Sequence, residues 1–222
     1  MMRKIVAVLL LAAILLLTGC TANAESFAER EYTADGDSIQ SVCIDVRDRR
    51  IEVSASEDDS IRIGYYESAK EFYTISLAGD GTLTMVLEND KEWRDYIGTK
   101  TDPAYRTITL QLPKERLSAL MLSTTNADIT LPAVSVSDRI TLSANGGDID
   151  FLLLGVGNAL TLEAKNGNIS GTVLGTYEDF AIFCTTKKGE CNLPAEKAEG
   201  EKALSVTANN GDVRIAFDNE AS

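Results

Sequence analysis

Apolar and polar residues alternate along most of the chain from residue 39 onward, and short clusters of Gly, Asn and Asp interrupt the alternation. A period of two is typical of β-strands that bury one face, and no stretch keeps the 3.6-residue apolar spacing of an amphipathic helix for long. The pattern therefore predicts a single all-β domain over residues 39–217, with very little helix and a short tail at 218–222.

One unit recurs along the second half of the chain. Three alternate apolar residues precede a four-residue turn, and alternate apolar residues follow it, as in Leu160, Leu162 and Ala164 before the turn at 165–168. The first residues after the turns are spaced 20, 20, 22 and 22 positions apart, and they are Ile129, Ile149, Ile169, Cys191 and Val213. A constant period of this size indicates stacked coils that bury their apolar sides against one another.

We interpret this unit as one coil of a β-solenoid with about five to six short coils. Each coil has two well-patterned strands and a looser third side, which runs through Val134 and Val136 in one coil and through Leu154 and Val156 in the next. The alternative is a β-sandwich in which each Asn-Gly pair forms a two-residue hairpin turn. The even spacing favours the solenoid, because the loops of sandwiches usually vary more in length.

Residues 60–113 separate a first, degraded copy of the unit at 42–53 from the regular copies. Asp80 and Gly81 give a tight turn, which predicts a hairpin between residues 72–77 and 83–87. We expect the whole segment to be an insertion that covers one end of the solenoid, because an open terminal coil exposes its strand edges.

The N-terminus has the pattern of a secretory signal. Arg3 and Lys4 precede thirteen apolar residues at 5–17, a run too short to span a bilayer. The sequence LTGC at 17–20 resembles the lipobox of bacterial lipoproteins. The alternatives are a plain signal peptide and an uncleaved anchor, and in both the cysteine carries no lipid.

The lipobox resemblance implies that residues 1–19 are a lipoprotein signal peptide and that cleavage leaves Cys20 as the new N-terminus. Cys20 would then carry a diacylglycerol and an acyl chain such as palmitate, which anchor the protein to a membrane. Residues 20–38 are polar and unpatterned, so we expect them to form a tether. The expected location is the extracytoplasmic face of the cell membrane, or the outer membrane where the host has one.

The chain is acidic and contains no histidine. Its formal charge of −13 becomes −15 without Arg3 and Lys4, which argues against nucleic-acid binding and against direct adsorption on anionic lipid. Such a charge keeps the protein soluble and would also attract cationic peptides. The absence of histidine excludes Ser-His-Asp and Cys-His catalysis and histidine-based zinc sites. We therefore expect no enzyme activity, no metal and no cofactor.

Carboxylates recur at the turns, where Asp128, Asp148 and Asp212 would stack in a column with Asn168 in the equivalent place. Some β-helix enzymes that act on acidic polysaccharides use clustered carboxylates, often with calcium. The favoured interpretation is structural: each side chain accepts hydrogen bonds from backbone amides at its own turn.

Two further features are candidate sites. Cys184 and Cys191 flank one turn and both point inward, so they form either a disulfide or two buried free thiols, while Cys43 points outward. Trp93 and Tyr96 lie in a polar insertion and are the candidate recognition patch, because loop aromatics stack on sugars or anchor peptides. The alternative is a loop that folds these rings back onto the domain.

The order of features resembles a bacterial extracytoplasmic family of unknown function whose members are labelled putative adhesins. The motifs are a strand ending in Leu-Pro and the Asn-Gly turns, at residues 110–113, 145–149, 166–169 and 209–213. The resemblance covers about residues 40–217 and implies a right-handed β-helix-like fold in the envelope, sometimes linked to envelope stress. It supplies no catalytic residues.

We therefore expect a non-catalytic envelope lipoprotein that presents a β-solenoid surface for binding or scaffolding. Its partner would be an envelope protein, a cationic peptide or a glycan, beside the membrane that holds the lipid anchor. The alternative function is that of a carbohydrate-active β-helix enzyme that uses surface carboxylates.

Overall fold

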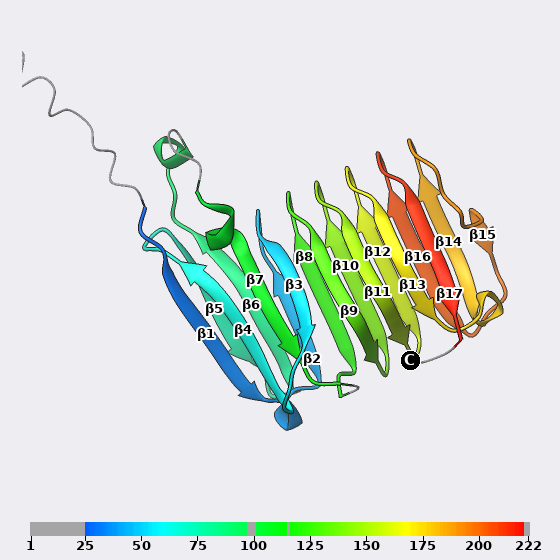
Figure 1. Ribbon diagram of the computed structural model, residues 1–222, viewed down its shortest axis with the longest axis horizontal. Helices are drawn as coiled ribbons and strands as arrows, with labels where there is room; N and C mark the ends of the chain where they lie inside the picture. Colours follow the sequence, from blue (N-terminus) through cyan, green and yellow to red (C-terminus); the bar gives the residue numbers. More distant parts are fainter. Residues whose placement is uncertain (1–24, 97–100, 115, 220–222) are drawn as a thin grey trace, which may run out of the picture.

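A computed structural model describes residues 25–96, 101–114 and 116–219 of the chain. In these ranges strands β1 to β17 form two sheets packed face to face, and four short 3₁₀ helices lie between strands (Figure 1). The all-β prediction is confirmed.

The two sheets are named here sheet A and sheet B, with their strands in spatial order. Sheet A contains β1 (Ala28–Asp35), β4 (Ser60–Glu67), β7 (Thr107–Leu112), β3 (Arg50–Ala55), β9 (Ile129–Val136), β11 (Ile149–Val156), β13 (Ile169–Leu174) and β17 (Val213–Asp218). Sheet B contains β15 (Glu196–Lys197), β14 (Phe180–Thr186), β16 (Lys202–Ala208), β12 (Ala159–Ala164), β10 (Arg139–Ala144), β8 (Ala119–Thr124), β2 (Ser41–Asp45), β6 (Thr82–Asn89) and β5 (Glu71–Leu77). The 3₁₀ helices are η1 (Gly36–Ser38), η2 (Trp93–Tyr96), η3 (Pro103–Arg106) and η4 (Tyr177–Asp179).

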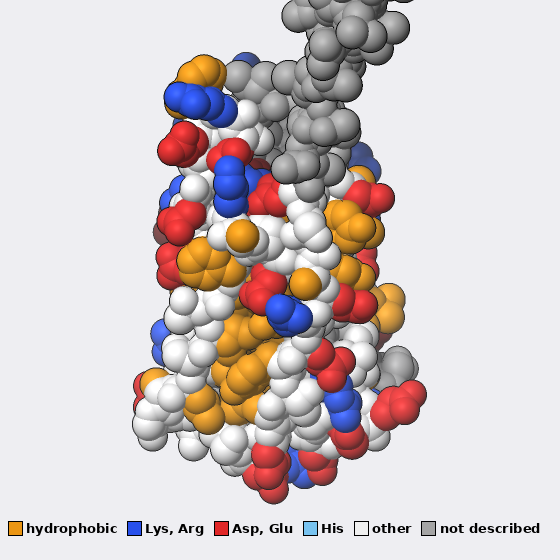
Figure 2. All heavy atoms as spheres, turned by 90° about the vertical axis from the view of Figure 1, so that its left-hand side faces the viewer, with side chains coloured by type: hydrophobic (Ala, Val, Ile, Leu, Met, Phe, Trp, Pro, Cys, Tyr) orange, Lys and Arg blue, Asp and Glu red, His pale blue; other side chains and the backbone are white. Residues whose placement is uncertain are grey.

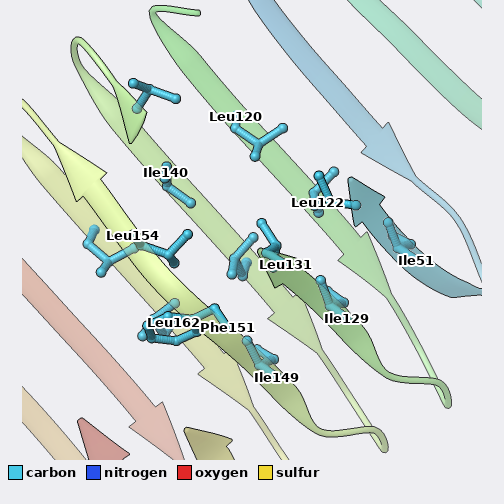
Figure 3. Close-up of a cluster of buried hydrophobic side chains, with 14 of the residues drawn as sticks. Ile51, Leu120, Leu122, Ile129, Leu131, Ile140, Ile149, Phe151, Leu154 and Leu162 are labelled. Carbon is cyan, nitrogen blue, oxygen red and sulfur yellow. The ribbon is translucent and has the colours of Figure 1, made fainter. Parts of the chain in front are cut away.

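Each regular repeat is one coil with a strand in each sheet. The chain leaves sheet B at the end of β8, turns through four residues that we call the corner, and continues as β9 in sheet A. Successive coils pair in parallel, so that Ile149 lies between Ile129 and Ile169. Figure 3 shows Ile129 and Ile149 following each other on neighbouring strands, with their side chains in the aliphatic interior. The predicted alignment of the coils is confirmed.

The third side of the coil was predicted wrongly. Val134 and Val136 belong to the eight-residue β9, and Leu154 and Val156 belong to β11, so both pairs continue sheet A. The register between β11 and β13 shifts after Phe151, because Leu152 has no partner in β13. Each coil is thus flattened and two-sided, and the sheets stay open. The sandwich alternative is wrong about the corners, because the strands that flank an Asn-Gly pair lie in different sheets.

The order of the coils in space departs from their order in the sequence. Ile51 of β3 pairs with Ile108 of β7 on one side and with Ile129 of β9 on the other. At the opposite end β16 lies between β12 and β14, so the last coil of the chain is inserted before the stretched one. The corners carry similar patterns, so the spacing alone does not determine which coils are neighbours.

The strands of residues 60–113 lie at one end of both sheets. β5 and β6 form an antiparallel hairpin, and Gly81 in its turn has a φ of 79°, which a residue with a Cβ rarely adopts. β4 pairs antiparallel with β7 and with β1. The tether prediction for residues 20–38 is wrong at its end, because Ala28–Asp35 forms β1. Tyr32 and Ala34 pack against the core and give β1 an apolar face, which the largely polar composition of residues 20–38 did not indicate.

Candidate functional site

The corner side chains bind the backbone of the adjacent coil. Oδ1 of Asp128 accepts a hydrogen bond from the amide of Asp148 at 3.1 Å, and Oδ1 of Asp148 accepts one from the amide of Asn168 at 2.7 Å. Oδ1 of Asn168 accepts from Asp212, and Oδ1 of Asp212 accepts from Glu190, at 3.0 and 2.9 Å. We call this column the corner ladder. The structural interpretation is correct except that each acceptor serves the next coil rather than its own.

The remaining carboxylate oxygens of the corner ladder are partly neutralised. Oδ2 of Asp128 lies 3.0 Å from Arg50, and Oδ2 of Asp212 lies 3.0 Å from Arg214. A shallow hollow of about 210 Å³ lies beside the column, with Asp150 in its lining. In the part of the chain that the structure describes, no three acidic or cysteine side chains are grouped as metal ligands.

A buried ionic cluster lies at the end of the stack that the inserted segment covers. Glu71 accepts hydrogen bonds or ion pairs from Arg49 at 3.0 Å, Lys91 at 3.1 Å and Arg106 at 3.5 Å. Arg49 is fully buried and also donates to the hydroxyl of Tyr73 at 2.8 Å. Burial raises the pKa of Tyr73, although the Arg49 charge opposes this.

Sequence reasoning missed this cluster. Arg49 occupies the third corner position, where the regular coils have a small residue: Ala127, Gly147, Gly167 and Gly211. A long cation at a position that otherwise holds glycine or alanine was the available signal. The distant residues Glu71 and Lys91 carried no such signal, because only the β5–β6 hairpin brings them to the corner.

The segment before β1 is bound to the edge of this cluster. Glu25 accepts from Lys91 at 2.7 Å and from the hydroxyl of Ser68, and the Phe27 ring stacks on Tyr105 with centroids 5.2 Å apart. Burial alone would raise the pKa of Glu25, but the hydrogen bonds from Lys91 and Ser68 outweigh it and lower the pKa below its usual value. The chain is therefore held against the domain from Glu25 onward.

The candidate cysteines lie together at the far end of the stack. Cys184 in β14 and Cys191 have their Sγ atoms 2.8 Å apart, and both are free thiols in the structure. Burial and the neighbouring Cys191 raise the pKa of Cys184 to about 12. The outward-facing Cys43 is half-buried beside Met121, and burial followed by the Asp45 charge raises its pKa.

The candidate recognition patch is described only in part. Trp93 lies in η2 with 69% of its surface exposed, and the Arg94 guanidinium lies 5.7 Å from its ring. Asp95 in the same helix binds Lys70. The side chain of Tyr96 lies outside the described residues, as does the whole of the lipid-attachment candidate Cys20.

The outer face of sheet B has one unbroken row of uncharged side chains. The strand registers place one such residue on each of eight neighbouring strands, which at about 4.8 Å per strand gives a row of about 34 Å. We call it the neutral row: Ser76, Thr84, Cys43, Met121, Thr141, Thr161, Ser205 and Phe183.

The corresponding row across sheet A is different. It contains Glu52, Asp150 and Arg214 among Thr and Ser residues. Met121 and Phe183 in the neutral row are 45% and 56% exposed. Interface cores are depleted in charge and enriched in methionine and aromatic residues, so sheet B has the more suitable face for a partner.

These features define the protein as a stack of two-sided β-coils whose polar corners are used for its own assembly. The chain belongs to the Toastrack DUF4097 family, whose model matches residues 39–221. This confirms the resemblance to the family of adhesin-like proteins.

One solved structure shares the overall fold, and a second is similar to a lesser degree. A putative cell adhesion protein from Clostridium sporogenes is 9% identical, with a TM-score of 0.52, over 87% of this chain and all of the other. A putative adhesin from Parabacteroides merdae is 16% identical, with a TM-score of 0.40, over 87% of this chain and 82% of the other. No curated protein matches this chain. Within the described ranges, none of the helices has the length and apolar content needed to cross a bilayer.

Proposed function

We propose that this protein is a non-catalytic, lipid-anchored envelope protein that binds or scaffolds a partner through the outer face of sheet B. The neutral row is the observation that carries this proposal. An acidic chain that keeps one row across eight strands free of charge offers a partner a surface with little desolvation cost. The proposal includes the lipid on Cys20, the extracytoplasmic location and a right-handed winding of the coils.

The chemistry of the neutral row favours an uncharged partner. Five of its eight members carry hydroxyl groups, which exchange hydrogen bonds with a neutral glycan or with a polar protein face. A cationic peptide would instead require the acidic positions at the corners. Trp93 offers a second contact at the covered end of the stack, where an exposed ring suits a sugar or an apolar anchor.

The binding proposal is tested in the cells that produce the protein. A photo-crosslinking residue at Thr141 in the neutral row should capture one envelope component, whereas the same residue at Thr172 on sheet A should not. Thr141→Glu should weaken capture at a neighbouring position, Thr161, and Thr172→Glu is the matched control. Equal capture from both faces would contradict the proposal.

The enzymatic alternative makes a different prediction. A carbohydrate-active enzyme needs free carboxylates, but the Oδ1 atoms of Asp128, Asp148 and Asp212 accept backbone amides. Asp148→Asn should leave folding and partner capture unchanged, because Asn168 already performs the same role. Loss of a glycan-cleaving activity in Asp148→Asn would favour the enzyme.

The lipid anchor is tested separately. Metabolic labelling with a radioactive fatty acid should label the wild-type chain, and the label should be lost in Cys20→Ser. The Cys20→Ser protein should also leave the membrane fraction. A wild-type protein that takes up no label would remove the lipoprotein part of the proposal without affecting the surface proposal.

A further inference from the structure

The stack has four sheet edges, and in the described part of the chain three of them are obstructed. At the far end β15 pairs with β14, and the Asn192 side chain bonds both the amide and the carbonyl of Ile215 in β17. At the covered end the edge of sheet A is β1, which carries Glu29, Glu31 and Asp35. Charged residues on an edge strand discourage the addition of another strand.

The fourth edge, β5, has none of these protections. Among the described residues it pairs only with β6. Its first residue, Glu71, is buried in the ionic cluster, and residues 72–77 read FYTISL, with no charge and no proline. β-branched and aromatic residues of this kind favour extended backbone. An uncharged edge strand with unpaired backbone groups is a template for pairing with another strand.

Apolar surface adjoins the open edge. Figure 2 looks onto this end of the stack and shows a strip of apolar side chains between paler margins. The two edge strands supply Tyr32, Ala34 and Ile75, which pack partly against the core, and Leu77, which is 44% exposed. A strand added to β5 would cover part of this strip.

We propose that two copies of the chain associate by antiparallel pairing of β5 with the β5 of the second copy. A two-fold axis normal to sheet B relates the copies and makes their nine-stranded sheets continuous. Antiparallel pairing supplies hydrogen bonds to the free backbone groups of both edges at once.

The distribution of charge favours self-pairing of β5 over self-pairing of β1. When the pairing is centred on Thr74, Phe72 faces Ser76 and Tyr73 faces Ile75, so no like charges oppose each other. When β1 pairs with itself around Tyr32, Glu29 faces Asp35 of the second copy. A chain of charge −13 approaches its own copy with least repulsion along an uncharged edge.

Cysteine crosslinking of the lipidated chain in its own membrane tests this pairing. Thr74→Cys lies near the proposed two-fold axis, so mild oxidation should convert most of it to a disulfide-linked dimer on a non-reducing gel. Thr141→Cys, on the same face but in the middle of sheet B, should stay monomeric, as should the parent chain. Absence of a dimer from Thr74→Cys would overturn the proposal.

Added charge on the edge provides a second measurement. Thr74→Lys with Ser76→Lys opposes lysines across the pairing and should raise the dimer Kd by about tenfold or more. The matched control is Thr141→Lys with Thr161→Lys, and light scattering of the detergent-solubilised protein measures both. A monomeric wild type, or a dimer that the edge lysines leave intact, would contradict the pairing. Neither result would bear on partner capture from Thr141.

Discussion

At the residue scale, the buried cluster around Glu71 should be a main contributor to stability at the covered end. Glu71→Gln leaves the buried Arg49 and Lys91 without their shared carboxylate. Removing one partner of a buried ion pair costs about 3–5 kcal/mol, because the remaining charge is uncompensated. Urea unfolding should show this loss in the free energy of unfolding.

The control for this change is Glu67→Gln. Glu67 pairs with Arg30, whose side chain is half exposed, and such surface pairs contribute about 0–1 kcal/mol. Equal losses of unfolding free energy in the two variants would show that the Glu71 cluster contributes no more to stability than a surface ion pair does.

The binding of the segment before β1 should depend on pH. The pKa of Glu25 in the folded protein lies below its ordinary value of 4.5, so the ionised form makes the favourable contacts. Their contribution is complete above about 4.5 and is lost as the pH falls through the lower folded value. Hydrogen exchange of the amides near Phe27, corrected for intrinsic pH effects, should rise in that acidic window.

Glu25→Gln is the matched control for this pH dependence. It should expose the same amides at every pH, since residue 25 no longer offers Lys91 a carboxylate and Lys91 keeps only its pairing with Glu71. An unchanged pH response in Glu25→Gln would assign the transition to another group.

The sequence predicted side-chain direction well and ionic partners poorly. Alternation alone placed Ile140, Leu142 and Leu162 inside the stack, because a strand has only two faces. It could not predict that Arg49 is buried, since a buried cation requires distant partners that the pattern of one strand does not contain. The Cys184–Cys191 neighbourhood was predictable because both residues flank one corner.

At the element scale, close stacking of the corners should make their glycines irreplaceable. A Cβ on Gly167 would lie 1.9 Å from the carbonyl oxygen of Gly147, and neither backbone can move without breaking the corner ladder. Gly167→Ala should therefore lower the free energy of unfolding by about 1–3 kcal/mol or more, as overpacking does in cores. Thermal unfolding measures this loss. Gly79→Ala is the control, because a Cβ there meets nothing within 4 Å, and it should have little effect on the free energy of unfolding.

In an oxidising compartment, a disulfide should stabilise the stretched corner. Cys184 and Cys191 are in contact, and closing their short loop is worth about 2–3 kcal/mol on chain entropy. The high pKa of Cys184, about 12, keeps this thiol protonated, so spontaneous air oxidation should be slow. If the bond forms in the cell, protein isolated from its own cells and then unfolded in denaturant should resist alkylation at both positions until it is reduced.

The Cys184→Ser variant is the control for this bond. It should be as stable as the reduced wild type and insensitive to reductant. Full alkylation of the native protein without reduction would show two free thiols instead.

The period of the repeats predicted the coils but not their order. The corners of the regular coils present similar apolar residues and similar hydrogen-bond acceptors. The coil of β16 and β17 can therefore pair with β12 and β13 as well as the stretched coil could. The stretched corner at Cys191 forms only one bridge, to Val213, and it lies at the end of sheet A. The long-range choice of neighbours depends on such small differences, which a repeat pattern does not contain.

At the scale of the whole molecule, the proposed lipid anchor and the proposed pairing of two copies restrict each other. Four residues lie between Cys20 and the bound Glu25, so five steps along the chain, at about 3.5 Å per step, reach at most about 18 Å. Two anchors can enter one bilayer only if the two-fold axis of the pair runs along the bilayer normal. That axis is normal to the sheets, so the sheets lie parallel to the membrane.

The side that faces the membrane follows from the chain path. The segment from Glu25 leads into β1, which belongs to sheet A, so sheet A should face the bilayer and the neutral row of sheet B should face outward. In liposomes that carry the lipidated protein on their outer surface, a bulky maleimide should react severalfold faster with Thr141→Cys than with Thr172→Cys in a Cys43→Ser background. The difference should vanish in detergent, where no bilayer shields sheet A. Equal rates in liposomes would mean that the stack stands on the membrane in another orientation, and the neutral row would lose its privileged access to partners.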